Sequence, residues 1–413
     1  YRRRAYRRVR TQYLKGRAVA QEWVNWSGSL RFTPERCVAP ESEEALAALV
    51  GQAASSGQTV RVVGSGHSSS PLVATAGLLV SLRALRSLIS HDQERCQVTI
   101  GAGITLHEAG KVLLPLGMAF ANLGDIDRQT IAGAFSTGTH GTGLSLPPLA
   151  AQLIGGRLVT GAGEVVAFDA RDPAVLNAVR VSLGALGVLT ELQLQLVPAH
   201  KLRKRTWCAG IEECLEHFAA LALAHRHVDF YWYPRSDEVK IRTMDPLDAA
   251  PATFPFARLL REEVGWSSEI TPNVRELRFE EMEYALPVEH GLACFREVRQ
   301  RIKARWRHLV GWRVLYRTIA ADDALLSLAH GRATATISLH QNATLPFREF
   351  FADVEPLLRA YGGRPHWGKQ HTLRAGQLRP LYPGWNRFLD VRQHLDPGGV
   401  FLNGPLRELL GVA

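Results

Sequence analysis

Three glycine-dense stretches constrain this chain more than any other feature of its sequence. They are GSGHSS at 64–69, NLGDIDRQTIAGAFSTGTHGTG at 122–143 and SLGALGVLTE at 182–191. The first follows a short apolar segment at 60–63 that is typical of a strand, and the others also lie beside strand or helix signals. Backbone N–H groups and hydroxyls in such loops can surround a phosphate without a lysine. Three of them in order predict a surface for a long ligand with a diphosphate in its middle.

The first stretch matches neither of two common glycine motifs. A dinucleotide fingerprint needs a third glycine where this chain has Ser69, and Pro71 follows two residues later. The nucleophile elbow of hydrolases, Gly-x-Ser-x-Gly, does not fit either. Taken alone, the stretch could be a plain turn that carries a surface histidine, His67. The glycines before that histidine would also let the turn lie close against a ligand.

The basic excess of the chain is concentrated in its first residues. The formal net charge is +10 at pH 7, and residues 1–17, YRRRAYRRVRTQYLKGR, hold eight basic residues and no acidic one. Without them the net charge falls from +10 to +2. Such an arm could contact nucleic acid or an anionic membrane surface, but a solvated terminal helix is the favoured interpretation. No nucleic-acid-binding motif accompanies the arm, so no nucleic-acid partner is expected.

Cysteine and histidine usage argues against metal sites and disulfide frameworks. The five cysteines are scattered and form no Cys-x-x-Cys pair. The fifteen histidines include no His-x-x-x-His pair, so a histidine-metal hydrolase is not supported and no metal is expected. Unpaired cysteines indicate a reducing compartment, and a cytoplasmic location is expected. No uncharged apolar run reaches about 18 residues, so no transmembrane helix is expected.

Local patterns divide the chain into two regions of different texture. Residues 18–200 alternate helix and strand signals, among them a capping box that starts at Thr105 and a hairpin pattern at 157–169. The texture changes near residue 201, and residues 206–345 are rich in aromatic side chains, as in DFYWYP at 229–234. We therefore expect a first domain of mixed α and β structure and a second domain after it.

A further motif, RPHWGKQH, lies at 364–371. His366, Trp367 and Lys369 are an unusual set for a turn that serves folding alone. A lysine near an electron-accepting ring could stabilise developing negative charge. The alternative is an exposed loop with a buried tryptophan.

These stretches together resemble the vanillyl-alcohol-oxidase-type flavoproteins, and more narrowly the sugar-lactone oxidases (gulonolactone, arabinonolactone) and the alditol oxidases. The segments that carry the resemblance are VGSGHS, LGDIDRQTIAGAFSTGTHGTG, GGRPHWGK and LDPGGVFLN, in this order. The resemblance implies a two-domain α+β fold whose FAD-binding domain is not a Rossmann fold. That domain would comprise residues 18–200 and a returning C-terminal segment at 372–413, with a substrate domain at 201–371 between them. The basic arm at 1–17 would precede both.

The resemblance also implies roles for individual residues around FAD. His67 stands where many members bond the 8α-methyl carbon of the flavin covalently, and imidazole nitrogen is a competent nucleophile. The diphosphate would be wrapped by Gly64, Ser65, Gly66 and Ser68. The other residues implied to line the flavin are Gly124, Asp125, Thr130, Gly133, Thr137, Gly138, Thr139, His140 and Val188.

The implied reaction is oxidation of a secondary alcohol on a sugar 1,4-lactone, with hydride transfer to flavin N5 and reoxidation by oxygen. An alditol oxidase, or a lactone dehydrogenase with another acceptor, is the alternative. Lys369 and Arg317 would stabilise charge and orient the substrate, and His340 would accept the hydroxyl proton. Gly124 would leave oxygen a path to the flavin, because a side chain at this position tends to accompany dehydrogenase behaviour.

Two positions depart from the family pattern. Leu315 replaces the glutamate of a Glu-x-Arg pair whose arginine is Arg317, and no acidic residue lies within four positions on either side. Because that glutamate is expected to touch substrate hydroxyls, we expect a substrate that differs from the family norm. Asp125 stands where several relatives have serine beside the flavin, and it could return a carboxylate to the site.

Overall fold

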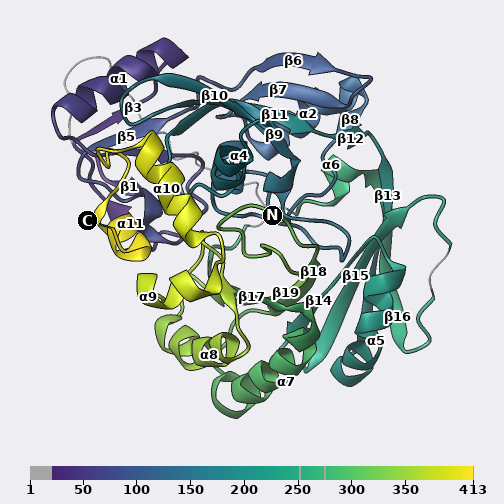
Figure 1. Cartoon of the computed structure of the whole chain (residues 1–413). Helices are drawn as coiled ribbons and strands as arrows, with labels where there is room; N and C mark the ends of the chain where they lie inside the picture. Colours follow the sequence, from purple (N-terminus) through teal and green to yellow (C-terminus); the bar gives the residue numbers. More distant parts are fainter. Residues whose placement is uncertain (1–20, 251–252, 274–275, 413) are drawn as a thin grey trace, which may run out of the picture.

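The protein consists of two bodies built around β-sheets (Figure 1), and the expected two-domain α+β class is confirmed. The computed structural model describes residues 21–250, 253–273 and 276–412. The predicted basic arm at 1–17 lies outside these residues. Within the described ranges, no helix is both long enough and apolar enough to cross a membrane.

A small parallel sheet holds the first glycine turn. Its strands, in spatial order, are β3 (Arg36–Val38), β5 (Leu78–Ser81) and β4 (Val60–Val63). Helix α1 (Glu43–Ser55) connects β3 to β4 and begins after Ser42, whose side chain accepts a hydrogen bond from the N–H of Ala45. The helix buries Leu46 and Val50 in the core. The turn after β4 therefore starts from a buried strand end.

An antiparallel sheet of five strands completes the first body. In spatial order it contains β10 (Val165–Asp169), β9 (Leu153–Val159), β11 (Val188–Gln195), β7 (Gln97–Gly101) and β6 (Leu88–Asp92). The predicted hairpin is confirmed as β9–β10, and the predicted capping box of Thr105 and Glu108 is confirmed at the start of α2. The smaller elements of this region are β1 (Trp23–Val24), β2 (Arg31–Phe32), α2 (Leu106–Leu113), β8 (Met118–Ala119), α3 (Ile131–Ser136), α4 (Pro173–Val179) and β12 (Val197–Pro198).

The second body is one antiparallel sheet of eight strands. In spatial order these are β16 (Ala257–Trp266), β13 (Lys201–Gly210), β15 (Glu238–Pro246), β14 (His227–Tyr233), β18 (Val314–Ile319), β19 (Thr334–Asn342), β17 (Phe279–Pro287) and β20 (Arg364–Pro365). Its helices are α5 (Ile211–Ala224), α6 (Ser267–Ile270), α7 (Gly291–Arg301) and α8 (Arg348–Ala360).

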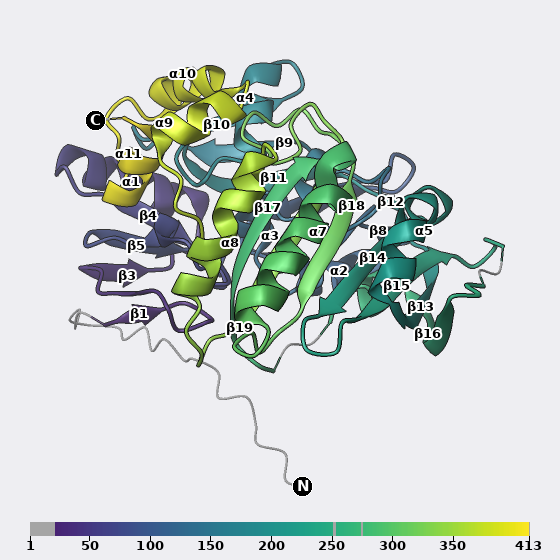
Figure 2. The ribbon, with the colours of Figure 1, turned by 90° about the horizontal axis from the view of Figure 1, so that it is seen from below.

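Side chains alternate between the two faces of this sheet, and helices cover one face (Figure 2). Phe230 of β14 packs against Phe218 of α5 and Phe295 of α7, and it stacks on Tyr316 of β18. Tyr284 of β17 donates a hydrogen bond to a carboxylate of α8 on the same face. The residues between these positions consequently point to the opposite face, which meets the first body.

The C-terminal segment packs on the first body. It contains α9 (Ala375–Leu378), α10 (Trp385–Leu395) and α11 (Gly404–Leu410), and α10 packs on α4. The N–H of Val60 in β4 donates to the carbonyl of Val400 at 2.9 Å. Asn403 donates to the carbonyl of Ala74 at 2.7 Å. The domain limits drawn from the sequence at residues 200 and 371 stay predictions.

Candidate active site

The first glycine turn opens onto a groove of about 300 Å³ between the two sheets of the first body. A side chain at Gly64 would place its Cβ 2.2 Å from Oγ1 of Thr130. Gly66 has φ +70°, the left-handed region that favours glycine. The predicted residues that line this groove are Gly64, Ser65, Gly66, His67, Ser68, Thr130, Gly133, Thr137 and Val188.

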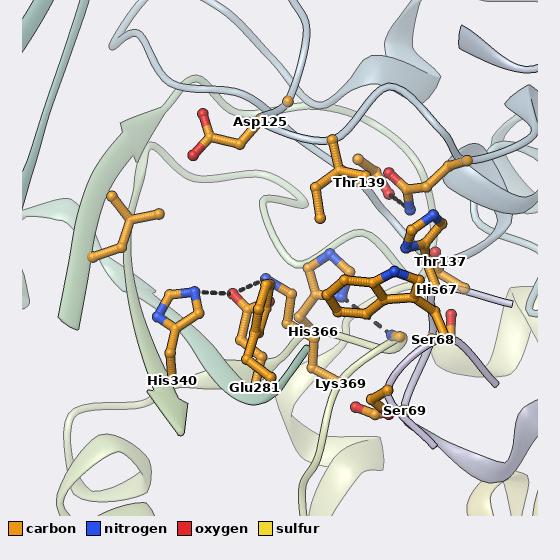
Figure 3. Close-up of a pocket in the computed structure, with 18 of the residues that line it drawn as sticks. His67, Ser68, Ser69, Asp125, Thr137, Thr139, Glu281, His340, His366 and Lys369 are labelled. Atoms are coloured by element: carbon orange, nitrogen blue, oxygen red, sulfur yellow. Dashed lines mark hydrogen bonds and ion pairs between the residues drawn. The ribbon is translucent and has the colours of Figure 1, made fainter. Parts of the chain in front are cut away.

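A second cavity of about 110 Å³ lies beside the groove, between it and the eight-stranded sheet (Figure 3). Trp26, Phe279 and Trp312 supply aromatic walls. The predicted residues that line it are His67, Ser68, Gly124, Asp125, Thr137, Thr139, His140, Arg317, His340 and Lys369. Gly138 belongs to neither lining; it has φ +74° and faces Leu328 and Val181.

His67 lines both cavities and marks the point where they meet. Burial lowers the pKa of its imidazole to about 4, against a smaller opposite effect of Asp127. The ring is therefore neutral at physiological pH. Its Nδ1 atom is buried and finds no hydrogen-bond partner in the described part of the chain. A neutral imidazole with an unengaged nitrogen can act as a nucleophile.

Strand register brings the polar side chains of the second cavity together on one face of the sheet. Tyr231 of β14 pairs with Leu315 of β18, which pairs with Ser338 of β19, which pairs with Glu283 of β17. Two residues away along β19 and β17, His340 pairs with Glu281, which also lines the cavity. Positions far apart in the sequence thus share one wall.

Lys369 is held between two carboxylates of β17. Its Nζ lies 2.5 Å from Oε1 of Glu281 and 2.6 Å from Oε2 of Glu283. Burial opposes the charge of this ammonium, but the two carboxylates outweigh burial and raise the pKa of Lys369. The lysine is therefore charged in a site largely shielded from water.

Two histidines surround the inner carboxylate, Glu283. Nε2 of His140 lies 2.5 Å from Oε1 of Glu283, and Nδ1 of His140 lies 2.8 Å from the carbonyl oxygen of Gly141. The Nδ1 of His366 accepts a hydrogen bond from the N–H of Gly368, and burial lowers the pKa of His366 to about 3. Ligand atoms of these three side chains lie within 4.8 Å of one another, a spacing that could suit a metal. The ammonium of Lys369 on Glu283 disfavours a second cation there.

His340 has its two ring nitrogens in different surroundings. Nδ1 lies 3.1 Å from the carbonyl oxygen of Arg313, which can only accept, so Nδ1 carries a proton. Nε2 lies 3.2 Å from Oε1 of Glu281 and belongs to the wall of the cavity. Both ring nitrogens therefore face acceptor oxygens, and the carboxylate of Glu281 stabilises a protonated ring.

Asp125 is engaged by cationic and phenolic groups. Nη2 of Arg317 lies 3.0 Å and Nη1 of Arg242 lies 3.1 Å from its Oδ1, and the hydroxyl of Tyr231 donates to its Oδ2. Arg242 also contacts Asp229 at 2.5 Å. Burial opposes the charge of Arg317, but Asp125 and Asp229 outweigh it and raise the pKa of that side chain. A role for Arg317 or Asp125 toward substrate stays a prediction.

Sequence reasoning missed the two carboxylates of β17. Glu281 and Glu283 stand at alternate positions of FEEMEYALP, a largely buried strand that also contains Glu280. Alternation places both on one face, and two acids on a buried strand face are rarely left without a function or a partner. That pattern was the available signal. Nothing local indicated that Lys369, more than 80 positions later, would be the partner.

The residues of the two cavities fit FAD. Gly64 and Gly66 form a backbone cradle that a Cβ would fill or strain, and the unpartnered Nδ1 of His67 points to a ligand at the junction. The charged Lys369 in the second cavity suits a flavin ring that accumulates negative charge on reduction. These features belong to three separate segments that converge only in the folded chain.

Two protein families, two relatives in sequence and one solved structure match this chain over most of its length when taken together. Residues 192–265 and 253–409 match the family described as D-arabinono-1,4-lactone oxidase, and residues 34–169 match the family described as FAD binding domain. The chain is 36% identical to an L-gulono-1,4-lactone dehydrogenase of Mycobacterium tuberculosis, covering 94% of this chain and 99% of that protein. It is 31% identical to an alditol oxidase of a Streptomyces species, covering 94% and 98%. The cholesterol oxidase of B. sterolicum shares the fold, with a TM-score of 0.85 over 95% of this chain and 97% of that chain, at 16% identity.

Proposed function

This chain belongs to the D-arabinono-1,4-lactone oxidase family, and we propose that it oxidises a secondary alcohol of a sugar 1,4-lactone. It is an FAD-dependent oxidoreductase. The observation that carries the proposal is the cluster of Lys369, Glu281 and His340, which lines a small cavity adjoining the groove at His67. A polyol is the second candidate substrate, because a relative at 31% identity is named an alditol oxidase.

FAD, when bound, supplies the two-electron acceptor of the reaction. The side chains of the second cavity position the substrate and handle the proton. Nε2 of His340 takes the proton of the substrate hydroxyl, and Glu281 stabilises the resulting imidazolium from 3.2 Å. Lys369 stabilises negative charge in a buried site, where the interaction is stronger than in water. Trp26, Phe279 and Trp312 exclude water from the reacting carbon.

We propose that His67 is bonded covalently to FAD. Support comes from its glycine-flanked turn, its position at the junction of the two cavities and its neutral, unpartnered ring. The diphosphate would lie along Gly64, Ser65, Gly66 and Ser68. Gly138 would act on the shape of the loop rather than by contact, since it lines neither cavity.

We propose oxygen as the electron acceptor. Gly124 lines the second cavity and leaves space that a side chain would occupy, so a path for oxygen is consistent with this position. The alternative is a dehydrogenase with another acceptor, which the name of the relative at 36% identity favours. We also propose a cytoplasmic location, because all five cysteines are free, as in proteins of reducing compartments.

The substrate class is tested by anaerobic mixing of the purified yellow protein with a panel of aldono-1,4-lactones and alditols. We expect at least one lactone to bleach the flavin absorption at a rate that saturates with concentration. Faster bleaching by alditols would move the assignment to an alditol oxidase. A protein that binds FAD but is bleached by neither class would contradict the proposed function.

A further inference from the structure

We propose that Glu281 binds a hydroxyl group of the substrate and so replaces the carboxylate that is absent at Leu315, an inference that rests on the proposed function. Leu315 lies on β18 and Glu281 on β17, with β19 between them. Both residues line the second cavity. The sheet therefore offers a carboxylate to the same cavity from a different strand.

The two oxygens of Glu281 have different surroundings (Figure 3). Oε1 receives both contacts of the side chain, from Nζ of Lys369 at 2.5 Å and from Nε2 of His340 at 3.2 Å. Oε2 has no hydrogen-bond partner within the described ranges, although the residue lines the cavity. The lysine and the histidine thus fix the carboxylate through one oxygen and leave the other to accept a hydrogen bond.

The charge state of Glu281 decides what this oxygen can bind. Burial opposes ionisation, but Lys369 and, after it, His340 together outweigh burial and lower the pKa of Glu281. An ionised carboxylate accepts hydrogen bonds and cannot donate them. Its partner in the substrate is therefore a hydroxyl group rather than a carbonyl or ring oxygen. The apolar side chain of Leu315, on the opposite side of β19, suits a part of the substrate without a hydroxyl.

Glu283 is a suitable control for Glu281, because it also contacts Lys369 but does not line the second cavity. Its Oε2 contacts Lys369 at 2.6 Å and also accepts from the hydroxyl of Ser338, while its Oε1 faces His140 at 2.5 Å. Both oxygens are occupied, and the side chain is 1% exposed. Neutralising Glu283 changes the charge beside Lys369 without removing a substrate contact.

The test measures anaerobic flavin reduction with aldono-1,4-lactones that differ by the absence of one hydroxyl at a time, excluding the hydroxyl that is oxidised. Glu281→Gln is expected to weaken the apparent affinity about 10- to 100-fold for lactones that carry the bound hydroxyl, the usual range for a hydrogen bond to a charged group. For the one analogue that lacks this hydroxyl, the loss should be under about threefold. Glu283→Gln should affect all members of the series alike.

Three outcomes are decisive. An equal loss for every lactone in Glu281→Gln would overturn the inference, because Glu281 would then only position Lys369 and His340. If the glutamine variant does not retain FAD, Glu281→Asp keeps the charge, withdraws the carboxylate by one methylene, and must show the same selective loss. If neither lactones nor alditols bleach the unmodified protein, the proposed function fails and the inference falls with it.

Transferring the acid provides a converse measurement. Leu315→Glu in the Glu281→Gln background is expected to recover activity on a lactone with a different hydroxyl arrangement. Leu315→Gln in the same background is the matched control for size. Recovery of the original lactone preference by Leu315→Glu would argue that position 281 does not select the hydroxyl.

Discussion

The two cavities that meet at His67 are built in opposite ways. The groove proposed for FAD, which we call the cofactor groove, is lined by short segments that contribute Gly64, Gly66, Gly103, Gly133, Gly184 and Gly187. One wall of the second cavity, which we call the substrate wall, consists of alternate side chains of β14, β18, β19 and β17. Their register is set by the pairing of strands across the whole sheet. Backbone recognition depends on local sequence, whereas side-chain convergence depends on pairing between distant strands.

The difference predicts how substitutions should act. Changes in the groove should alter the binding or attachment of FAD while leaving the second cavity intact. Changes in the second cavity should alter turnover or reoxidation while FAD stays bound.

His67→Ala should abolish covalent attachment of FAD completely, because among the described residues no other offers a neutral, unengaged nitrogen at the junction. The measurement is acid precipitation followed by fluorescence of the denatured band. His371→Ala is the control: burial also lowers the pKa of that histidine to about 4, but it lines neither cavity. Quantitative release of flavin from the unmodified protein would refute the covalent bond.

Lys369→Met should slow flavin reduction by lactone about 10²- to 10³-fold, the range for removing one group that stabilises developing charge. Stopped-flow bleaching of the FAD-loaded variant provides the measurement. Lys204→Met removes another buried lysine, which donates to the carbonyl of Ile270 at 2.7 Å and lines neither cavity. Its reduction rate should stay within about threefold of the unmodified rate. If the Lys369 variant reduces flavin within tenfold of that rate, Lys369 does not stabilise the charge that develops during flavin reduction.

Gly103→Ala should destabilise the cofactor groove by about 1–3 kcal/mol, the usual loss on overpacking. The new Cβ would lie 1.8 Å from the carbonyl oxygen of Leu82, a backbone atom that cannot move away freely. The temperature at which FAD fluorescence appears on heating should fall. Gly376→Ala meets nothing within 4 Å and should leave that temperature unchanged. Equal behaviour of the two variants would contradict the tight packing described at Gly103.

Gly124→Ala should slow reoxidation of the reduced flavin severalfold and keep substrate affinity largely unchanged. The added Cβ would lie 3.1 Å from the carbonyl oxygen of His140, so only a small local shift is needed to accommodate it. Stopped-flow reoxidation in aerated buffer measures the effect. An unmodified enzyme that reoxidises no faster than free reduced flavin would instead be a dehydrogenase, and hydrogen peroxide would not accumulate during turnover.

Much of the cofactor groove could be predicted from the sequence, because its elements are local. The turn after 60–63, the capping box at Thr105 and the hairpin at 157–169 each depend on residues close together in the chain. The same locality made the family and the α+β class recognisable. Gly138 is harder to place: its motif predicts contact with the cofactor, and this stays a prediction, since a side chain at this position would face Leu328 and Val181.

The sequence by itself determined the class of the protein, because glycine turns and a family-specific order of motifs can be recognised without knowing how the strands pair. Only the tertiary structure decided the chemistry of the substrate wall. It placed the carboxylate of Glu281 on β17 in the same cavity as Leu315 and surrounded Asp125 with Arg242 and Arg317. The physical reason is that a charge selects its partner by distance in space. Sheet register sets that distance between strands that lie tens of residues apart in the chain.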